Sequence, residues 1–182
     1  MLPARPTSWK GHEVLIKAVA ALNRPDVTLL LLGAGDGAPR FVAGLEQLAR
    51  KTGLDGRLRI AAGSDDMPSA LMLADVIAMP SIVPEPFGRV AVEAGAMGRP
   101  IVAFNHGGAV ESVLNGQTGW LAEPGDISDL SRALVTALDL SQEKRAELAK
   151  KSRAHIIKSF SKEKMCKKTL EIYDELLQNR AR

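Results

Sequence analysis

Short, uninterrupted apolar runs alternate along this chain with longer segments in which apolar residues recur every three or four positions. The runs predict strands at residues 27–32, 58–61, 76–79, 101–104 and 120–122, and residues 1–4 resemble the last part of one more strand. Because these runs are apolar at successive positions and do not alternate with polar residues, we expect each strand to be covered on both faces.

The segments with helical periodicity predict helices at residues 12–22, 39–51, 68–73, 88–97, 109–114, 127–138, 142–157 and 161–177. Their alternation with the strands indicates an α/β fold, a Rossmann-like doubly wound parallel sheet with helices on both faces. Ser141 and Ser161 are predicted to cap the last two helices. We therefore expect one domain over residues 1–182, with a core of about residues 1–140 and C-terminal helices at about 141–178.

Composition sets further limits. Of the 182 residues, 46% are hydrophobic and only 4% aromatic, so we expect one aliphatic core. The single cysteine, Cys166, has no partner for an internal disulfide, as is usual in a reducing cytoplasm. The net charge of +3 gathers near the C-terminus and not on a face with aromatics, so no nucleic acid partner is expected. No run is long enough for a membrane span and no signal-peptide pattern begins the chain, so we expect a cytoplasmic protein.

The most informative segment for a binding site follows the strand at residues 76–79. In an open parallel sheet, ligands bind where strands end and helices begin. Glu85 lies between two prolines, which keep it outside the following helix. Glu93 lies about one and a half turns inside that helix, where its carboxylate is suited to accept hydrogen bonds from a vicinal diol such as a ribose. Taken singly, Glu85 is most simply a turn residue and Glu93 a solvated one, but the pair at this spacing favours a site.

The start of the same helix is suited to bind an anion. Gly88 lets a ligand approach the backbone closely. The N–H groups of Gly88, Arg89 and Val90 would have no partner inside the helix, so they form a candidate phosphate site at the positive end of the helix dipole.

Glu85 and Glu93 together resemble the Glu-x7-Glu motif of the retaining GT-B glycosyltransferases, in particular glycosyltransferase family 4, also called group 1. Other segments resemble the family in the same order: Arg5 with Lys10 and Gly11, then 29–35, 74–75, 94–100, 106–108, Glu111 and 116–121. The resemblance covers nearly the whole chain. It implies the C-terminal, donor-binding half of a GT-B fold, with the N-terminal acceptor domain absent.

The resemblance implies a role for each matching residue. Arg5 and Lys10 would neutralise a diphosphate and stabilise the leaving group in place of a metal, while Glu85 would bind hydroxyls of the donor sugar. Glu93 would hold the ribose, and the loop around Gly63 would lie along the base. The implied catalytic set is Arg5, Lys10 and Glu85, and the nucleotide-sugar-binding set is Arg5, Lys10, Gly63, Glu85, Phe87, Gly88, Arg89, Val90 and Glu93.

The implied reaction transfers a hexose from a UDP-, GDP- or ADP-sugar to a hydroxyl acceptor, as in the synthesis of cell-surface glycans or lipopolysaccharide. In the retaining family the acceptor hydroxyl is thought to lose its proton late to the departing phosphate, so no catalytic base is expected on the protein. No cofactor and no metal are expected. The identity of the nucleotide, the sugar and the acceptor stays open.

Some residues support other interpretations. Residues 33–38 fit the G-x-G-x-x-G/A fingerprint of an NAD-dependent oxidoreductase, but the acidic residue that should end the next strand is missing, so a tight turn is simpler. Asp65 and Asp66 resemble a metal-binding pair, although an N-cap is the more usual explanation. His12 is expected to be exposed and without a role, and His106 either lines the site or belongs to a flexible turn.

One half of a two-half enzyme implies a partner. An acceptor-binding domain or partner chain would complete the cleft, so the chain alone is expected to be inactive; the alternatives are a subunit of a split enzyme and a non-catalytic nucleotide-sugar-binding module. Ile172, Tyr173 and Leu176 would then be exposed or packed against a second copy in a homodimer. The C-terminal lysines form a solvated face or, alternatively, make peripheral contact with the inner face of a membrane. These are Lys158, Lys162, Lys164, Lys167 and Lys168.

Overall fold

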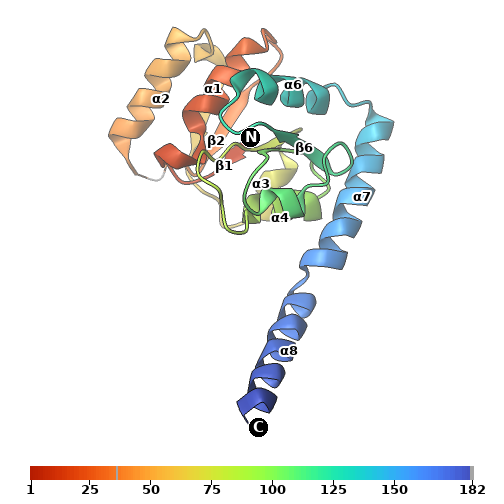
Figure 1. Ribbon diagram of the computed structural model, residues 1–182. Coiled ribbons are helices and arrows are strands. Elements are labelled where there is room, and N and C mark those ends of the chain that lie inside the picture. Colours follow the sequence, from red (N-terminus) through yellow and green to blue (C-terminus); the bar gives the residue numbers. More distant parts are fainter. Residues whose placement is uncertain (36, 181–182) are drawn as a thin grey trace.

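The computed structural model describes residues 1–35 and 37–180, which form a parallel β-sheet structure flanked by helices (Figure 1). The described strands are β1 (Leu2–Pro3), β2 (Leu29–Leu32), β3 (Leu58–Ala61), β4 (Ile77–Met79), β5 (Ile101–Phe104) and β6 (Gly119–Ala122). They make two three-stranded parallel sheets, ordered β1-β2-β3 and β4-β5-β6.

Met1 joins the two sheets edge to edge. Its amino group donates a hydrogen bond of 2.8 Å to the Val76 carbonyl, and its own carbonyl accepts one of 2.8 Å from the Ala78 N–H. Across both sheets the strand order is therefore β3-β2-β1-β4-β5-β6, which is the Rossmann order. The predicted doubly wound sheet is confirmed.

The helices of the core are α1 (His12–Ala21), α2 (Pro39–Lys51), α3 (Met67–Met72), α4 (Arg89–Ala96), α5 (Ala109–Ser112) and α6 (Ile127–Leu138), with short 3-10 turns η1 (Ser8–Lys10) and η2 (Asp55–Arg57). Successive side chains of a strand point to opposite faces. In β5, Val102 and Phe104 accordingly join a hydrophobic cluster with α1, α2 and α6, whereas Ile101 and Ala103 join a second cluster with α3, α4 and α5. Helices thus cover both faces, as the uninterrupted apolar runs predict.

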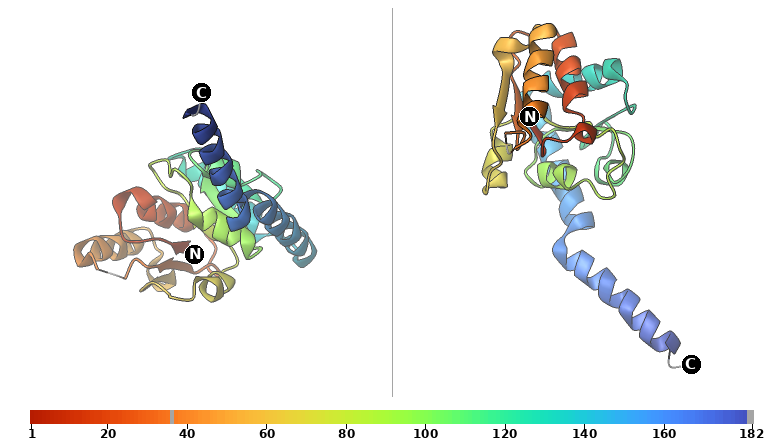
Figure 2. Two further views of the ribbon diagram at one scale, coloured as in Figure 1. Left: turned by 90° about the horizontal axis from the view of Figure 1, so that it is seen from below. Right: turned by 90° about the vertical axis from the view of Figure 1, so that its left-hand side faces the viewer.

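Two long helices follow the core, α7 (Gln142–Phe160) and α8 (Lys162–Arg180). Ser141 and Ser161 cap them as predicted, since each hydroxyl accepts a hydrogen bond of 3.2 Å from the N–H three residues later. Helix α7 packs against α4, where Gly95 leaves space for Ile156. Helix α8 projects away from the body of the molecule (Figures 1 and 2).

The apolar side chains of α8 have no cover among the described residues. Leu170, Ile172, Tyr173, Leu176 and Leu177 are each more than half exposed, with values from 56% to 66%. On a helix these positions fall on one side, because residues three and four apart share a face. The rest of this chain therefore leaves Ile172, Tyr173 and Leu176 uncovered, which fits both predicted alternatives, exposure and packing against a second copy.

Candidate functional site

An open cleft of about 970 Å³ lies at the carboxyl edge of the sheet, where β1, β2 and β3 end and α4 begins. All nine residues that the sequence singles out line this cleft: Arg5, Lys10, Gly63, Glu85, Phe87, Gly88, Arg89, Val90 and Glu93. They come from segments separated by as many as 88 positions in the chain. The fold therefore brings one set of predicted residues into one place.

Lys10 and Glu85 form the centre of the site. The Lys10 ammonium lies 2.8 Å from one Glu85 carboxylate oxygen, and the two side chains are 18% and 13% exposed. The other carboxylate oxygen accepts a hydrogen bond from the Ser81 hydroxyl. The ammonium also lies 4.2 Å from the centre of the Trp9 ring, a cation–π contact. Both oxygens of Glu85 are thus engaged, although the carboxylate retains further lone pairs.

Backbone contact brings Lys10 and Glu85 together. Gly11 has φ of +78°, and a Cβ there would lie only 1.8 Å from the Pro80 carbonyl oxygen. Next to this contact, the Ile82 N–H donates to the Trp9 carbonyl at 2.7 Å. Only glycine fits such a position, so the loop after β1 and the loop after β4 touch main chain to main chain.

The segment from His106 to Gly108 supports the Glu85 loop from the other side. A Cβ on Gly107 would lie 2.4 Å from the Glu85 carbonyl oxygen, and the Gly108 N–H donates to that oxygen at 2.8 Å. The His106 Nε2 lies 2.8 Å from the Ser81 carbonyl oxygen. These glycines are therefore required by close packing against the site loop, which a flexible turn does not explain.

Helix α4 presents both its N-terminus and Glu93 to the cleft. Gly88 precedes the helix with φ of +73°, and the first N–H groups of a helix have no partner inside it. Glu93 pairs with Arg89 one turn earlier, with 2.7 Å between guanidinium nitrogen and carboxylate oxygen. Both carboxylates of the Glu-x7-Glu pair are thus paired with a basic side chain.

Sequence reasoning missed several residues of the cleft. Trp9, Met67, Leu71 and Met97 supply an apolar lining, and Ser81 holds Glu85. Trp9 had a usable signal, because it directly precedes Lys10 in the Arg…Lys-Gly segment. The methionines had none, because Met at helical spacing is typical of any core.

The structure decides between the other interpretations where it describes the residues. His12 is 0% exposed, so its expected exposure is wrong; its ring packs edge-on against Phe41, and burial lowers its pKa below 6.5. Asp66 is the N-cap of α3, accepting a hydrogen bond of 3.1 Å from the Ser69 N–H. Within residues 33–38 the backbone turns at Gly33, with φ of +86°, whereas Asp36 lies outside the described residues.

Two kinds of feature are absent from the described residues. No group of three or more His, Cys, Asp or Glu side chains in residues 1–35 and 37–180 is arranged to hold a metal ion. Over the same part of the chain, no helix combines the length and the apolar character needed to cross a membrane.

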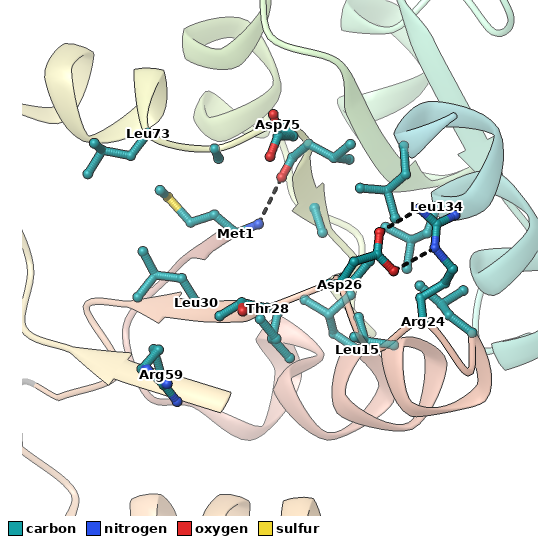
Figure 3. Close-up of a pocket in the computed structure, with 18 of the residues that line it drawn as sticks. Met1, Leu15, Arg24, Asp26, Thr28, Leu30, Arg59, Leu73, Asp75 and Leu134 are labelled. Carbon is teal, nitrogen blue, oxygen red and sulfur yellow. Dashed lines mark hydrogen bonds and ion pairs between the residues drawn. The ribbon is translucent and has the colours of Figure 1, made fainter. Parts of the chain in front are cut away.

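A second cavity, of about 500 Å³, lies at the amino edge of the sheet, on the opposite side from the cleft (Figure 3). Met1, Leu30 and Leu134 contribute apolar surface to its wall, which also carries charged side chains. In this wall Arg24 and Asp26 are paired with each other: the Arg24 guanidinium donates two hydrogen bonds of 2.8 and 2.7 Å to Asp26 and lowers the pKa of that carboxyl to about 2. None of the nine predicted site residues lines this cavity.

Comparison with known proteins points to one family. Residues 3–155 match the family model described as glycosyl transferases group 1. The chain is 34% identical over 154 residues to the lipopolysaccharide core biosynthesis glycosyltransferase LpsE of Rhizobium meliloti, covering 85% of this chain and 43% of that protein.

Solved structures of glycosyltransferases share the fold along nearly the whole chain. A glycosyltransferase from Rickettsia africae is 34% identical with a TM-score of 0.91, over 98% of this chain and 47% of that one. HepE from Anabaena, solved in complex with UDP and glucose, is 33% identical with a TM-score of 0.87, over 96% and 47%. The chain spans less than half the length of these relatives.

Proposed function

Because the chain belongs to the group 1 glycosyl transferases, with the fold of their C-terminal GT-B half, we propose that its cleft binds a nucleoside diphosphate sugar. Residues 1–182 act as one nucleotide-sugar-binding domain, with its core in about residues 1–140. One observation carries the proposal: the paired Lys10 and Glu85 share an open cleft with Arg5 and Glu93. The structure of HepE with UDP and glucose supports this choice of ligand.

Basic groups of the cleft bind the diphosphate. Arg5 is exposed at the cleft and turns toward the ligand, while Lys10 reaches the phosphate by sharing its ammonium between Glu85 and the ligand. Each charge-assisted hydrogen bond contributes about 1.5–3 kcal/mol. The same cations stabilise charge on the departing diphosphate, so transfer is metal-independent.

The two glutamates bind hydroxyl groups. Glu85 accepts hydrogen bonds from the donor sugar, and Glu93 accepts them from the ribose after Arg89 turns out into solvent. Arg89 is 82% exposed, so its side chain loses little when it leaves Glu93. The base lies along the loop at Gly63 and the apolar wall beside Met67.

The reaction is a hexosyl transfer to a hydroxyl acceptor with retention of configuration, as the family 4 resemblance implies. Arg5, Lys10 and Glu85 are the catalytic residues, and the acceptor loses its proton late to the departing phosphate. The similarity to LpsE supports a place in cell-surface glycan or lipopolysaccharide-type synthesis, on the cytoplasmic side where nucleotide sugars are available.

Transfer requires an acceptor-binding domain, which in the proposal docks on the exposed apolar face of α8. Helix α8 begins just after Phe160, whose ring contacts Phe87 of the cleft at 5.9 Å between centroids. A partner on α8 is therefore close to the donor.

This position of α8 also favours the second candidate function, a nucleotide-sugar-binding subunit that is inactive by itself. If the chain by itself transfers a hexose to a simple alcohol, it does not depend on a partner. If it sediments with anionic vesicles, or sediments as a homodimer, then a membrane or a second copy covers α8 instead.

Calorimetric titration tests the ligand. The probes are UDP, GDP, ADP and their glucose or mannose conjugates, with and without EDTA, on the unmodified chain, Lys10→Met and Glu93→Gln. We expect one nucleotide to bind regardless of EDTA, and to bind at least about tenfold more weakly in both variants, as loss of a charge-assisted bond of about 1.5–3 kcal/mol requires. Lys17→Met and Glu46→Gln, exposed on α1 and α2, are matched controls. Tight binding of NAD(H) that ignores Glu93→Gln revives the oxidoreductase alternative and refutes the proposal.

A further inference from the structure

Ser81 holds Glu85 without lining the cleft. Its side chain is buried, with 3% exposed, and it is not among the described residues that form the cleft wall. Glu85, by contrast, lines the cleft and accepts the hydrogen bond of the Ser81 hydroxyl. Ser81 is therefore placed to act on a ligand only through Glu85.

The two protein contacts of Glu85 fix its carboxylate plane. Lys10 lies on one oxygen and the Ser81 hydroxyl on the other, so rotation of the carboxylate breaks both contacts. A carboxylate has about four lone-pair sites, so acceptor capacity remains for sugar hydroxyls in a set orientation. Without the hydroxyl, the flexible Lys10 side chain is the one remaining side-chain contact of this carboxylate among the described residues.

Ser81 is itself held in place. Its carbonyl oxygen can only accept, so the 2.8 Å contact with His106 assigns the proton to Nε2 of that ring. Four residues along the loop, Glu85 is held by the backbone of Gly107 and Gly108. A group held on both sides loses little freedom when a ligand binds, which is the condition for a preorganised site.

We propose that Ser81 is a positioning residue that orients Glu85 toward hydroxyls of the donor sugar, and that it contributes to recognition of the sugar but not of the nucleotide. The inference rests on the proposed function of the cleft. Recognition of the sugar is separated from recognition of the nucleotide because the Ser81 side chain contacts Glu85, whereas the ribose and the base are assigned to Glu93 and Gly63.

The test compares each nucleotide with its own sugar conjugate. Dissociation constants are measured by calorimetry for UDP and UDP-glucose, GDP and GDP-mannose, and ADP and ADP-glucose, on the unmodified chain, Ser81→Ala and Ser81→Thr. In Ser81→Ala we expect the ratio of the conjugate's constant to the nucleotide's constant to rise about tenfold, with the nucleotide's own constant within about twofold. Ser81→Thr keeps the hydroxyl and restores the ratio.

Three further variants keep the result specific. Ser152→Ala, also buried but on α7, leaves the ratio unchanged. Ser81→Cys, a weak donor of similar volume, gives an intermediate ratio and a second measurement without a void. In a Glu85→Gln background, Ser81→Ala has less effect on the ratio than in the unmodified chain.

Each remaining outcome overturns a defined statement. An unchanged ratio in Ser81→Ala, with nucleotide binding intact, overturns the role of Ser81 alone. Equal weakening of nucleotide and conjugate shows general damage to the loop and also overturns it. Failure of the unmodified chain to bind any of the nucleotides overturns the proposed function, and the role of Ser81 in sugar recognition with it.

Discussion

Replacing Gly11 by alanine tests how the site is assembled. Gly11 has φ of +78°, and the added Cβ would lie 1.8 Å from the Pro80 carbonyl oxygen. Gly116 has nearly the same backbone conformation, φ of +72°, with nothing within 4 Å of its Cβ position. The two substitutions therefore share the left-handed backbone cost of about 1–2 kcal/mol, and they differ in the contact with the loop after β4.

The difference between the two variants measures that contact. Forcing a methyl group into a filled site costs about 1–3 kcal/mol beyond the backbone cost, so we expect Gly11→Ala to lose about 2–5 kcal/mol and Gly116→Ala about 1–2 kcal/mol. For a chain of this length, 1 kcal/mol shifts Tm by about 2–4 °C, so the variants should fall by about 10 °C and about 4 °C.

Urea unfolding followed by circular dichroism, with a thermal scan as a second measure, gives both values. Gly11→Ala should also weaken nucleotide binding, because Lys10 moves with the displaced backbone. If Gly11→Ala is no less stable than Gly116→Ala, the two loops are not held by main-chain contact, and the assembly of the site described above is wrong.

Three further changes test the core and a helix cap. Burial holds the pKa of His12 below 6.5, so below about pH 6.5 the unfolded chain binds a proton at this residue more readily than the folded chain does. The free energy of unfolding therefore falls as the pH drops below about 6.5. His12→Leu should reduce this dependence on pH, measured by urea unfolding at several pH values. Leu130→Ala, at a side chain that is 0% exposed, should cost about 2–5 kcal/mol, whereas Leu177→Ala, at one that is 66% exposed, should stay within about 0.5 kcal/mol in the same assay. Ser141→Ala removes the cap of α7 and should lower the urea midpoint by the equivalent of about 1 kcal/mol; an unchanged midpoint means that the hydrogen bond to the Lys144 N–H contributes nothing.

Local patterns were sufficient to predict most elements. The strands β3 and β5 and the helices α2 and α6 have the predicted bounds, because each lies between clear turn signals. The predicted strand at 27–32 begins only at Leu29, since pairing with β3 begins there. Helix α7 continues to Phe160, three residues beyond its predicted end, because no residue in that stretch stops a helix.

The site was predictable in its membership but not in its contacts. The Glu-x7-Glu spacing identified Glu85 and Glu93, and both line the cleft. No local pattern indicates that Ser81 donates to Glu85 or that Lys10 pairs with it, because these contacts depend on how two distant loops approach each other. His12 was misjudged for the same reason, since its burial depends on Phe41 from another helix.

The sequence by itself determined the order and type of the elements, because period and turn chemistry act within a few residues. It also determined which residues carry the chemistry of a donor site, through their spacing and their resemblance to one family. Only the tertiary structure decided that Gly11 and Gly107 enclose the Glu85 loop, that Met1 joins the two sheets, and that α8 is left uncovered. These features depend on how segments far apart in the sequence pack against one another, and no pattern within a single segment predicts that packing.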